Sequence, residues 1–410
     1  MTILLKKLSI LFMFGSFFGF TQPIITNFNI DNSQLSFNTV RCIAIQNEIK
    51  WFGTDNGLCS FDGTIWNVYN VENSPLIDDD IRALKVEDDS TIWIGTMQGG
   101  LYRKINDNWT NYLESNSGLH DNLVRGIEID SLDNIWLATS EGVSKFDRTN
   151  WFNWNVANNG LLTNNITAIK TGFQNQKYVG SINGGLLYFD GNENLTIHSI
   201  VESGLPDNSS LAIDIDINGQ PWYATPAAGL VTDWGNGGPW ERWNMSNSPI
   251  PTNGLTSISI NPIDGRIFMG TQLSGIVIKK NDIWFNYNAE NTDLPEDYIT
   301  CIAHESQFVK WAGTFNSGVV KIEEPNSGLI DYSNKTLQVY PTVLTNFDLL
   351  HFSIPVWGKL SITDNSGRVI SIINIENSQE IDLQLVETGF YMLKIDFSKK
   401  SYFFKILYTN

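Results

Sequence analysis

The sequence is poor in basic residues. It contains 26 Lys and Arg against 44 Asp and Glu, which gives a formal net charge of −18. Nucleic acids and anionic membranes are bound through basic faces that neutralise phosphate groups. The composition therefore argues against a nucleic-acid partner and against attachment to an anionic lipid surface.

Cysteine and histidine are also scarce, with three Cys and four His in 410 residues. Three cysteines do not make a disulfide framework. No HExxH, CxxC, GxSxG or Walker motif is present. His304 and Glu305 lack a second His four residues on, so we expect His304 to be a solvated strand end and not a metal ligand. The sequence favours a binding protein over an enzyme and indicates no catalytic, metal or cofactor site.

Long hydrophobic runs are nearly absent. The single candidate is Leu8–Phe20, which follows Lys6 and Lys7. This run is too short to span a bilayer and has the length and basic flank of a secretion signal. We predict a signal peptide over residues 1–21, cleavage near Gln22 and no transmembrane segment.

Tryptophan, in contrast, is abundant, with 14 residues, and much of it belongs to an internal repeat. Seven related strings recur at intervals of roughly 42 to 46 residues, a period typical of propeller blades. They are WFGTDNGL at Trp51, WIGTMQGGL at Trp93, WLATSEGV at Trp136, YVGSINGGL at Tyr178, WYATPAAGL at Trp222, FMGTQLSGI at Phe268 and WAGTFNSGV at Trp311. The repeat predicts an all-β fold, a seven-bladed β-propeller over residues 22–323.

Each repeat is predicted to form four short strands. In the second copy these are Ile81–Val86, Ile92–Thr96, Gly100–Lys104 and Trp109–Leu113, separated by turn residues. The recurring Gly after the second strand indicates a turn with positive φ. A column of small residues in the first strands suits sheets that converge on the ring axis, and buried free Cys fits such a column. Its members are Cys42, Ala83, Gly126, Ala168, Ala212, Ser257 and Cys301.

The seventh copy lacks a fourth strand of its own. The segment ITNFNIDNSQL at Ile25–Leu35 nearly repeats WNVYNVENSPL at Trp66–Leu76. We therefore expect the N-terminal segment to supply the outermost strand of blade seven and so to remove a free sheet edge.

The repeat, of the form V-x-x-I-x-x-D-x-x-x-x-I-W-x-G-T-x-x-G-G-L, resembles the two-component-regulator propeller repeat. That family forms the periplasmic sensor regions of hybrid histidine kinases in Bacteroidetes, which bind glycan fragments. The resemblance covers about residues 24–323 and implies the propeller fold.

A polar linker, residues 324–336, leads to a region without the blade motif. Seven short strands within residues 337–410 suggest a small β-sandwich. The region resembles the type A C-terminal sorting domain of the type IX secretion system in VYP at Val339, ITDNSGRVI at Ile362, IDLQL at Ile381, TGFYMLKI at Thr388 and FFKI at Phe403. The resemblance implies contact with the type IX machinery through residues 337–410, and release from the cell or attachment to its outer surface.

One constellation suggests a ligand site. Arg41, Arg82 and Arg125 precede the small column on three successive blades, so they should meet near the central channel. Guanidinium groups suit carboxylates, sulfates or sugar hydroxyls. Loops between second and third strands should rim the same opening with Asn56, Gln98, Glu141, Asn183 and Asn316. The alternative interpretation is structural, with the arginines paired to carboxylates such as Asp80.

The sequence thus predicts an exported, non-catalytic propeller that binds an oligosaccharide or a surface protein. The alternative from another class is a secreted propeller lyase acting on a polysaccharide or a lactone. A purely structural surface component is the third possibility.

Overall fold

The computed structural model describes residues 23–233, 239–281 and 283–324, and within the C-terminal region residues 339–340, 343–344, 350–364, 368–381, 383, 388–397 and 400–408. The predicted signal peptide and the linker beyond Glu324 lie outside these residues. The chain divides into two compact units, Met1–Pro325 and Asn326–Asn410.

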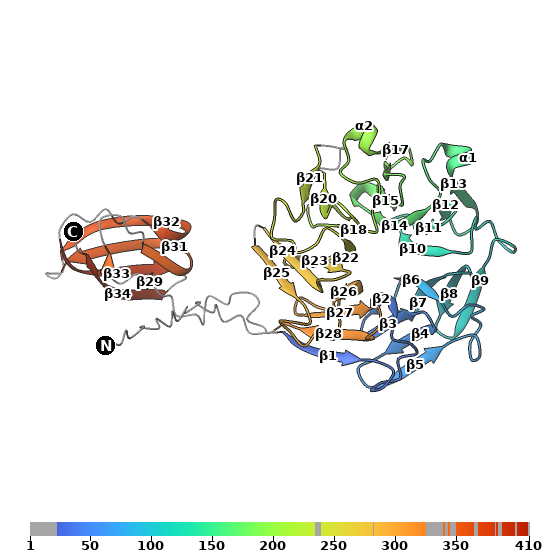
Figure 1. Ribbon diagram of the computed structural model, residues 1–410, viewed down its shortest axis with the longest axis horizontal. Coiled ribbons are helices and arrows are strands. Elements are labelled where there is room, and N and C mark those ends of the chain that lie inside the picture. The colour runs from blue at the N-terminus through green and yellow to red at the C-terminus, as the bar shows by residue number, and fades with distance from the viewer. Residues whose placement is uncertain are drawn as a thin grey trace, which may run out of the picture. The chain divides into compact units, whose positions relative to one another are not determined.

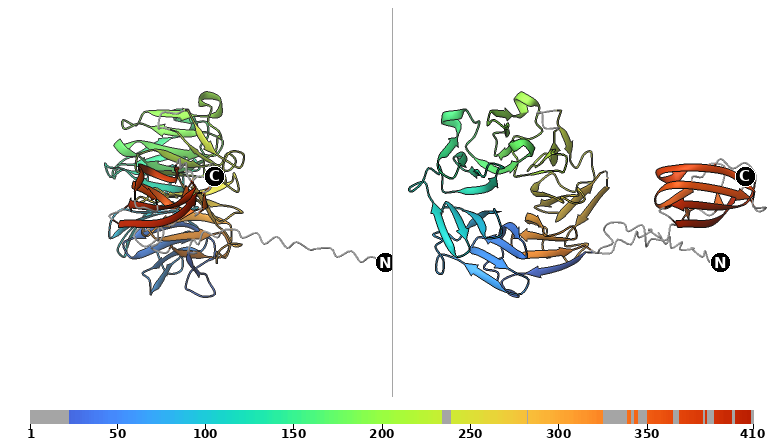
Figure 2. Two further views of the ribbon diagram at one scale, coloured as in Figure 1. Left: turned by 90° about the vertical axis from the view of Figure 1, so that its left-hand side faces the viewer. Right: turned by 180° about the vertical axis from the view of Figure 1, so that it is seen from behind.

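The first unit consists of seven four-stranded antiparallel sheets arranged around a common axis (Figure 1), as the repeat predicted. Figure 2 shows the same ring from the side and from behind. Blades 1 to 3 comprise β2 (Val40–Gln46), β3 (Ile49–Thr54), β4 (Gly57–Phe61), β5 (Trp66–Tyr69); β6 (Ile81–Val86), β7 (Thr91–Thr96), β8 (Leu101–Ile105), β9 (Asn108–Tyr112); and β10 (Val124–Ile129), β11 (Ile135–Thr139), β12 (Gly142–Phe146), β13 (Trp151–Trp154).

Blades 4 to 7 continue the pattern around the ring. They comprise β14 (Ile166–Thr171), β15 (Lys177–Ser181), β16 (Leu186–Phe189), β17 (Leu195–His198); β18 (Ala212–Ile215), β19 (Pro221–Ala224), β20 (Leu230–Thr232), β21 (Glu241–Trp243); β22 (Leu255–Ile260), β23 (Ile267–Thr271), β24 (Ile276–Lys280), β25 (Ile283–Tyr287); and β26 (Ile299–His304), β27 (Val309–Thr314), β28 (Val319–Glu323), β1 (Ile24–Phe28). Two one-turn helices, α1 (Val156–Asn159) and α2 (Ile200–Ser203), and a 3-10 turn, η1 (Phe173–Asn175), lie in the connections.

Strand β1 completes blade 7, which confirms the predicted closure. It pairs antiparallel with β28, from Ile24 opposite Glu323 to Phe28 opposite Val319. The Phe28 ring lies 5.7 Å from Trp311 in blade 7 and 5.8 Å from Trp66 in blade 1. The closing strand therefore fills the seam between the last blade and the first as well as extending a sheet.

The recurring tryptophans of the second strands are buried between blades and have a fixed polar partner. The indole N–H of Trp93 donates to Glu87 at 2.6 Å, that of Trp136 to Asp130 at 2.8 Å and that of Trp311 to Glu305 at 2.7 Å. Each acceptor directly follows its blade's first strand, so one hydrogen bond joins the indole to that strand's end. A buried donor left without an acceptor would cost stability.

The G-T motif and the following Gly form a second repeated contact. In blade 2 the Thr96 hydroxyl donates to the Gly100 carbonyl at 3.1 Å, and Gly100 has φ of +75°. A Cβ on Gly100 would lie 2.3 Å from the Tyr112 carbonyl oxygen of the fourth strand. The residue just before the third strand of this blade must therefore be Gly, both because of its positive φ and because the fourth strand passes so close.

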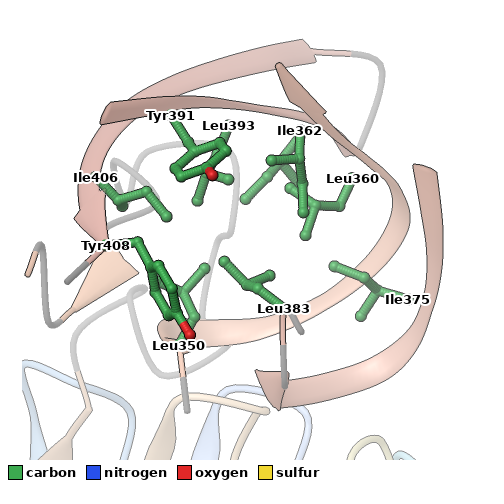
Figure 3. Packing of buried hydrophobic residues seen from close by; sticks show 10 residues of the cluster. Leu350, Leu360, Ile362, Ile375, Leu383, Tyr391, Leu393, Ile406 and Tyr408 are labelled. Carbon is green, nitrogen blue, oxygen red and sulfur yellow. The ribbon is translucent and has the colours of Figure 1, made fainter. Parts of the chain in front are cut away.

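In the described part of the second unit, six strands form one connected sheet. They are β29 (Val339–Tyr340), β30 (Val343–Leu344), β31 (Leu350–Asp364), β32 (Val369–Ile381), β33 (Gly389–Phe397) and β34 (Lys400–Tyr408). The long β31 pairs with β29, β32 and β33. Figure 3 shows the strands curving around a core that includes Leu360, Ile362, Leu393 and Ile406. This unit therefore has a hydrophobic core of its own.

Loss of the closing strand should unfold the ring at a lower temperature. Phe28 is partly buried, so Phe28→Ala should lower the free energy of unfolding by less than the about 3–5 kcal/mol that truncating a fully buried Phe costs. Deletion of residues 24–31 should cost more. Ile24→Ala, at an exposed position, is the control and should change it by less than about 0.5 kcal/mol. An unchanged melting temperature for the deletion would contradict the closure.

Gly100 and Gly204 have similar φ angles but different surroundings. Alanine substitution at each can therefore distinguish the cost of backbone strain from the cost of a steric clash. Gly100 (φ +75°) faces the Tyr112 carbonyl, whereas a Cβ added to Gly204 (φ +70°) would meet no other atom within 4 Å. Gly100→Ala should therefore destabilise the protein by about 1–3 kcal/mol more than Gly204→Ala, which is the range for overpacking. Chemical denaturation of both variants measures the difference, and equal losses would show that φ alone requires Gly100.

Candidate functional site

A β-bulge places the three arginines. In β2 the register passes from Val40 opposite Thr54 to Cys42 opposite Gly53, which leaves Arg41 as the extra residue. The same shift leaves Arg82 unpaired in β6 and Arg125 unpaired in β10. A bulge re-aims the side chain of its extra residue. The small residue that follows each arginine keeps its place in the ladder.

The three arginines lie together at the end of the ring where the first strands begin, which we call the mouth face. With Met97 and Leu123 they line a cavity of about 280 Å³, here named the arginine cavity. Its lining comes from blades 1, 2 and 3. The arginines thus converge where the sequence placed them.

Arg41 and Arg82 are paired with carboxylates. Arg41 binds both oxygens of Asp55, at 2.6 and 2.7 Å, and this hydrogen-bonded pairing raises the pKa of Arg41. Arg82 donates to Asp80 at 2.5 Å. Burial raises the pKa of Asp80, and the other Asp80 oxygen has no hydrogen-bond partner in the described structure. For these two arginines the expected structural pairing is present.

Arg125 differs from the other two. Its guanidinium donates to the Asn165 side-chain oxygen at 2.5 Å and to the Ile166 carbonyl at 3.2 Å, both neutral acceptors. Within the described part of the chain it forms no ion pair, and burial lowers its pKa. The nearby Asp121 carboxylate offsets part of this lowering. A half-buried cation whose hydrogen-bond partners are neutral can still gain charge-assisted hydrogen bonds from an anion.

Two aromatic rings flank this cluster across the closure seam. The Arg41 guanidinium lies 5.4 Å from the centroid of the Phe315 ring, which stacks on Tyr298 at 4.8 Å. Neither ring is fully buried. Sequence reasoning missed both, along with Asp55 and Met97. Asp55, Met97 and Phe315 are each the first residue of a loop between a second and a third strand. They stand one position before the loop residues predicted from the sequence, so the same repeat alignment could have found them.

The five named loop residues lie on the mouth face but do not line the arginine cavity. They take part in bonds that brace the loops: the backbone amides of Asn56, Gln98, Asn183 and Asn316 donate to Thr54, Asp78, Ser209 and Glu296, and the Glu141 carboxylate accepts from Asn164. The structure assembles the arginines and leaves these five outside their cavity.

A chain of alternating charges lies deeper along the same strands, three residues beyond the bulges. Lys85 binds Glu128 at 2.7 Å, and Lys170 lies 3.8 Å from Glu128 and 2.9 Å from Asp214. Burial alone would lower the pKa of Lys170, but the two carboxylates raise it above the ordinary value. The four side chains pair with one another. This row of ion pairs therefore links the first strands of neighbouring blades and leaves neither of its two lysines unpaired.

The expectation of a solvated His304 was wrong. Its ring packs edge-on against Phe268 at 5.1 Å, and Nε2 lies 3.4 Å from the Ser259 carbonyl oxygen. β26 packs against β22 and β23 of the neighbouring blade, so His304 contacts that blade and is partly buried. Burial lowers the pKa of His304 to about 4. Among the described residues, no group of three His, Cys, Asp or Glu side chains could hold a metal ion.

Comparison with known proteins identifies the C-terminal region. Residues 338–409 match the secretion system C-terminal sorting domain family. The chain therefore carries a type IX sorting domain, which indicates delivery to the cell surface or to the outside. No curated protein matches the chain significantly. No helix in the described ranges is long and apolar enough to cross a membrane.

Solved structures share the propeller fold. The extracellular domain of a putative hybrid two-component system from B. thetaiotaomicron is 18% identical, with a TM-score of 0.64 over 95% of this chain and 58% of that one. PorZ, a surface component of the type IX secretion system of Porphyromonas gingivalis, is 15% identical, with a TM-score of 0.60 over 91% of this chain and 60% of that one. This chain thus spans about three fifths of their length.

A virginiamycin B lyase from Staphylococcus aureus is 13% identical, with a TM-score of 0.60 over 74% of this chain and 99% of the lyase. At these identities the likenesses show the fold alone. They confirm the predicted similarity to the extracellular propellers of two-component systems.

The partly buried His304 should make stability depend on pH. An unfolded His takes up a proton near pH 6.5, but the folded side chain does so only near pH 4. Stability should therefore fall by up to about 3 kcal/mol as the pH drops through this window. His304→Gln removes this contribution, so its melting temperature should fall less between pH 7 and 4 than that of the wild type. Parallel profiles for the two proteins would contradict the burial.

Proposed function

We propose that this protein is an exported binding protein whose propeller holds an acidic glycan in the arginine cavity. The observation that carries the proposal is Arg125, a half-buried guanidinium whose hydrogen-bond acceptors among the described residues are neutral and which Asp121 attracts without forming an ion pair with it. A carboxylate or sulfate in the cavity would gain charge-assisted hydrogen bonds without breaking an existing ion pair. The sorting domain agrees with a role outside the cell.

The aromatic pair favours a sugar as the carrier of that anion. Phe315 and Tyr298 stack beside Arg41, so a flat apolar surface adjoins the charged cavity. The C–H faces of a sugar ring pack against such a surface while the hydroxyls stay in water. A uronate or sulfated sugar residue supplies both a ring and an anion. The same cavity accepts the carboxylate of a protein partner, which is the competing outcome of the test.

The lyase alternative has less support. Proton abstraction needs a base within hydrogen-bond reach of the substrate. The cavity is lined by Arg41, Arg82, Arg125, Met97 and Leu123, and none of these side chains accepts a proton near neutral pH. The geometry supports holding an acidic ligand more than breaking a bond in it.

Removal of the Arg125 charge should weaken binding of an acidic sugar. With a glucuronate-terminated disaccharide as probe, calorimetry on residues 22–410 should show Arg125→Gln binding about ten- to a hundredfold more weakly, because a hydrogen bond to a charged group contributes about 1.5–3 kcal/mol. The matched control is Arg242→Gln, which removes an exposed arginine of β21 outside the cavity.

The outcomes separate the alternatives. The wild type should bind the glucose-terminated disaccharide more weakly than the glucuronate-terminated one. This difference in affinity should be smaller for Arg125→Gln. Equal affinities for Arg125→Gln and Arg242→Gln would place the site elsewhere. Binding of an acidic peptide, but of no sugar, would assign the cavity to a protein ligand.

A further inference from the structure

The face opposite the mouth carries a row of exposed apolar side chains, here named the apolar arc. On this face each blade presents the turn between its first and second strands. In blades 3 to 6 these turns expose a large apolar side chain: Leu132 is 71% exposed, Phe173 57%, Ile217 61% and Ile263 63%. The same turns in blades 1 and 2 expose Glu48 and Asp89. The apolar residues thus occupy four consecutive blades (Figure 1).

Contacts link the neighbouring turns of blades 3, 4 and 5. Ser131, beside Leu132, donates through its backbone amide and its hydroxyl to Asn175 in the next turn, at 3.0 Å each. The Phe173 ring then lies over Gly219, where an added Cβ would come within 2.7 Å of it. Between the turns of blades 5 and 6 is a cavity of about 220 Å³, lined by Ile217, Trp222 and Ile267 and by polar side chains that include Asp216, Asp264 and Lys280. Four exposed apolar side chains on consecutive turns, with a mixed apolar and polar cavity beside one of them, resemble an interface more than scattered surface residues.

The rest of this face is acidic. Its turns expose a further set of carboxylates on blades 1 to 3, namely Asp62, Asp88, Asp107 and Asp133. The cations at this end are mostly turned inward: Lys104 and Lys279 are buried under aromatic rings, where each donates to a turn carbonyl. Backbone hydrogen bonds lower the pKa of Asp62 and Asp88, so these carboxylates stay ionised. The face therefore combines exposed apolar side chains on blades 3 to 6 with exposed carboxylates, some of which, such as Asp133 beside Leu132, lie in the same turns.

We infer that this face docks a protein partner whose surface combines an apolar patch with lysine or arginine residues. Charge complementarity selects this occupant. A second copy of the chain would bring carboxylates against carboxylates or against the apolar arc, and an anionic lipid surface would be repelled. The site is separate from the arginine cavity, so the two proposals stand or fall independently.

The test uses residues 22–410 and two synthetic amphipathic helices, one of leucine and lysine and its counterpart of leucine and glutamate. The leucine–lysine peptide should bind, and more weakly as salt rises. A variant with Leu132, Phe173, Ile217 and Ile263 all changed to Ser should bind it at least about tenfold more weakly. The matched control changes Val201 and Leu273, which are exposed apolar residues on mouth-face connections, to Ser and should retain the wild-type affinity.

A second variant set guards against misfolding, because Phe173 packs on the neighbouring turn. The triple change that keeps Phe173 should retain the wild-type melting temperature and still lose affinity. Asp62→Asn with Asp107→Asn and Asp133→Asn should reduce the salt dependence. Equal binding by wild type and the Ser variants would overturn the proposal, as would equal binding of the leucine–glutamate peptide. Self-association of the wild type that the Ser variants lose would also overturn it, in favour of a second copy.

Discussion

The antiparallel pairing of β1 with β28 is the contact on which the rest of the propeller depends. It joins residues about three hundred positions apart in sequence and places Phe28 between Trp311 of blade 7 and Trp66 of blade 1. The same seam brings Arg41 of blade 1 to the Phe315 ring of blade 7. The aromatic and charged parts of the candidate site are therefore brought together by ring closure and not by either blade alone.

One bulge position, used differently in successive blades, breaks the symmetry of the ring. In blades 4 and 6 the extra residue is Thr167 or Thr256, whose hydroxyl donates to a backbone carbonyl of the next blade at 2.5 Å and so seals the seam. In blades 1, 2 and 3 the position holds arginine, and the three side chains meet in one cavity. The same bulge position therefore joins neighbouring blades through threonine on one side of the ring and carries a cluster of arginines on the other.

Features that repeat in every blade could be predicted from the sequence. Features that depend on a single neighbouring residue were harder to predict. The period, the glycine turns, the small column and the closing strand each follow from a pattern present several times, so tertiary context could not hide them. The bulge could not be predicted, because the extra residue does not interrupt the pattern that indicates a continuous strand. The pairing of Arg41 with Asp55, the stacking of Phe315 on Tyr298 and the burial of His304 depend on loops and blades far apart in sequence.

The proposed function depends on an anionic ligand binding to the Arg125 guanidinium. A crystal structure of residues 22–410 with a glucuronate-terminated disaccharide tests it most directly. The account predicts the carboxylate within hydrogen-bond distance of the Arg125 guanidinium, with Arg41 still bound to Asp55 and a sugar ring near Phe315. A cavity that holds only water, or a sugar bound elsewhere on the propeller, would contradict it.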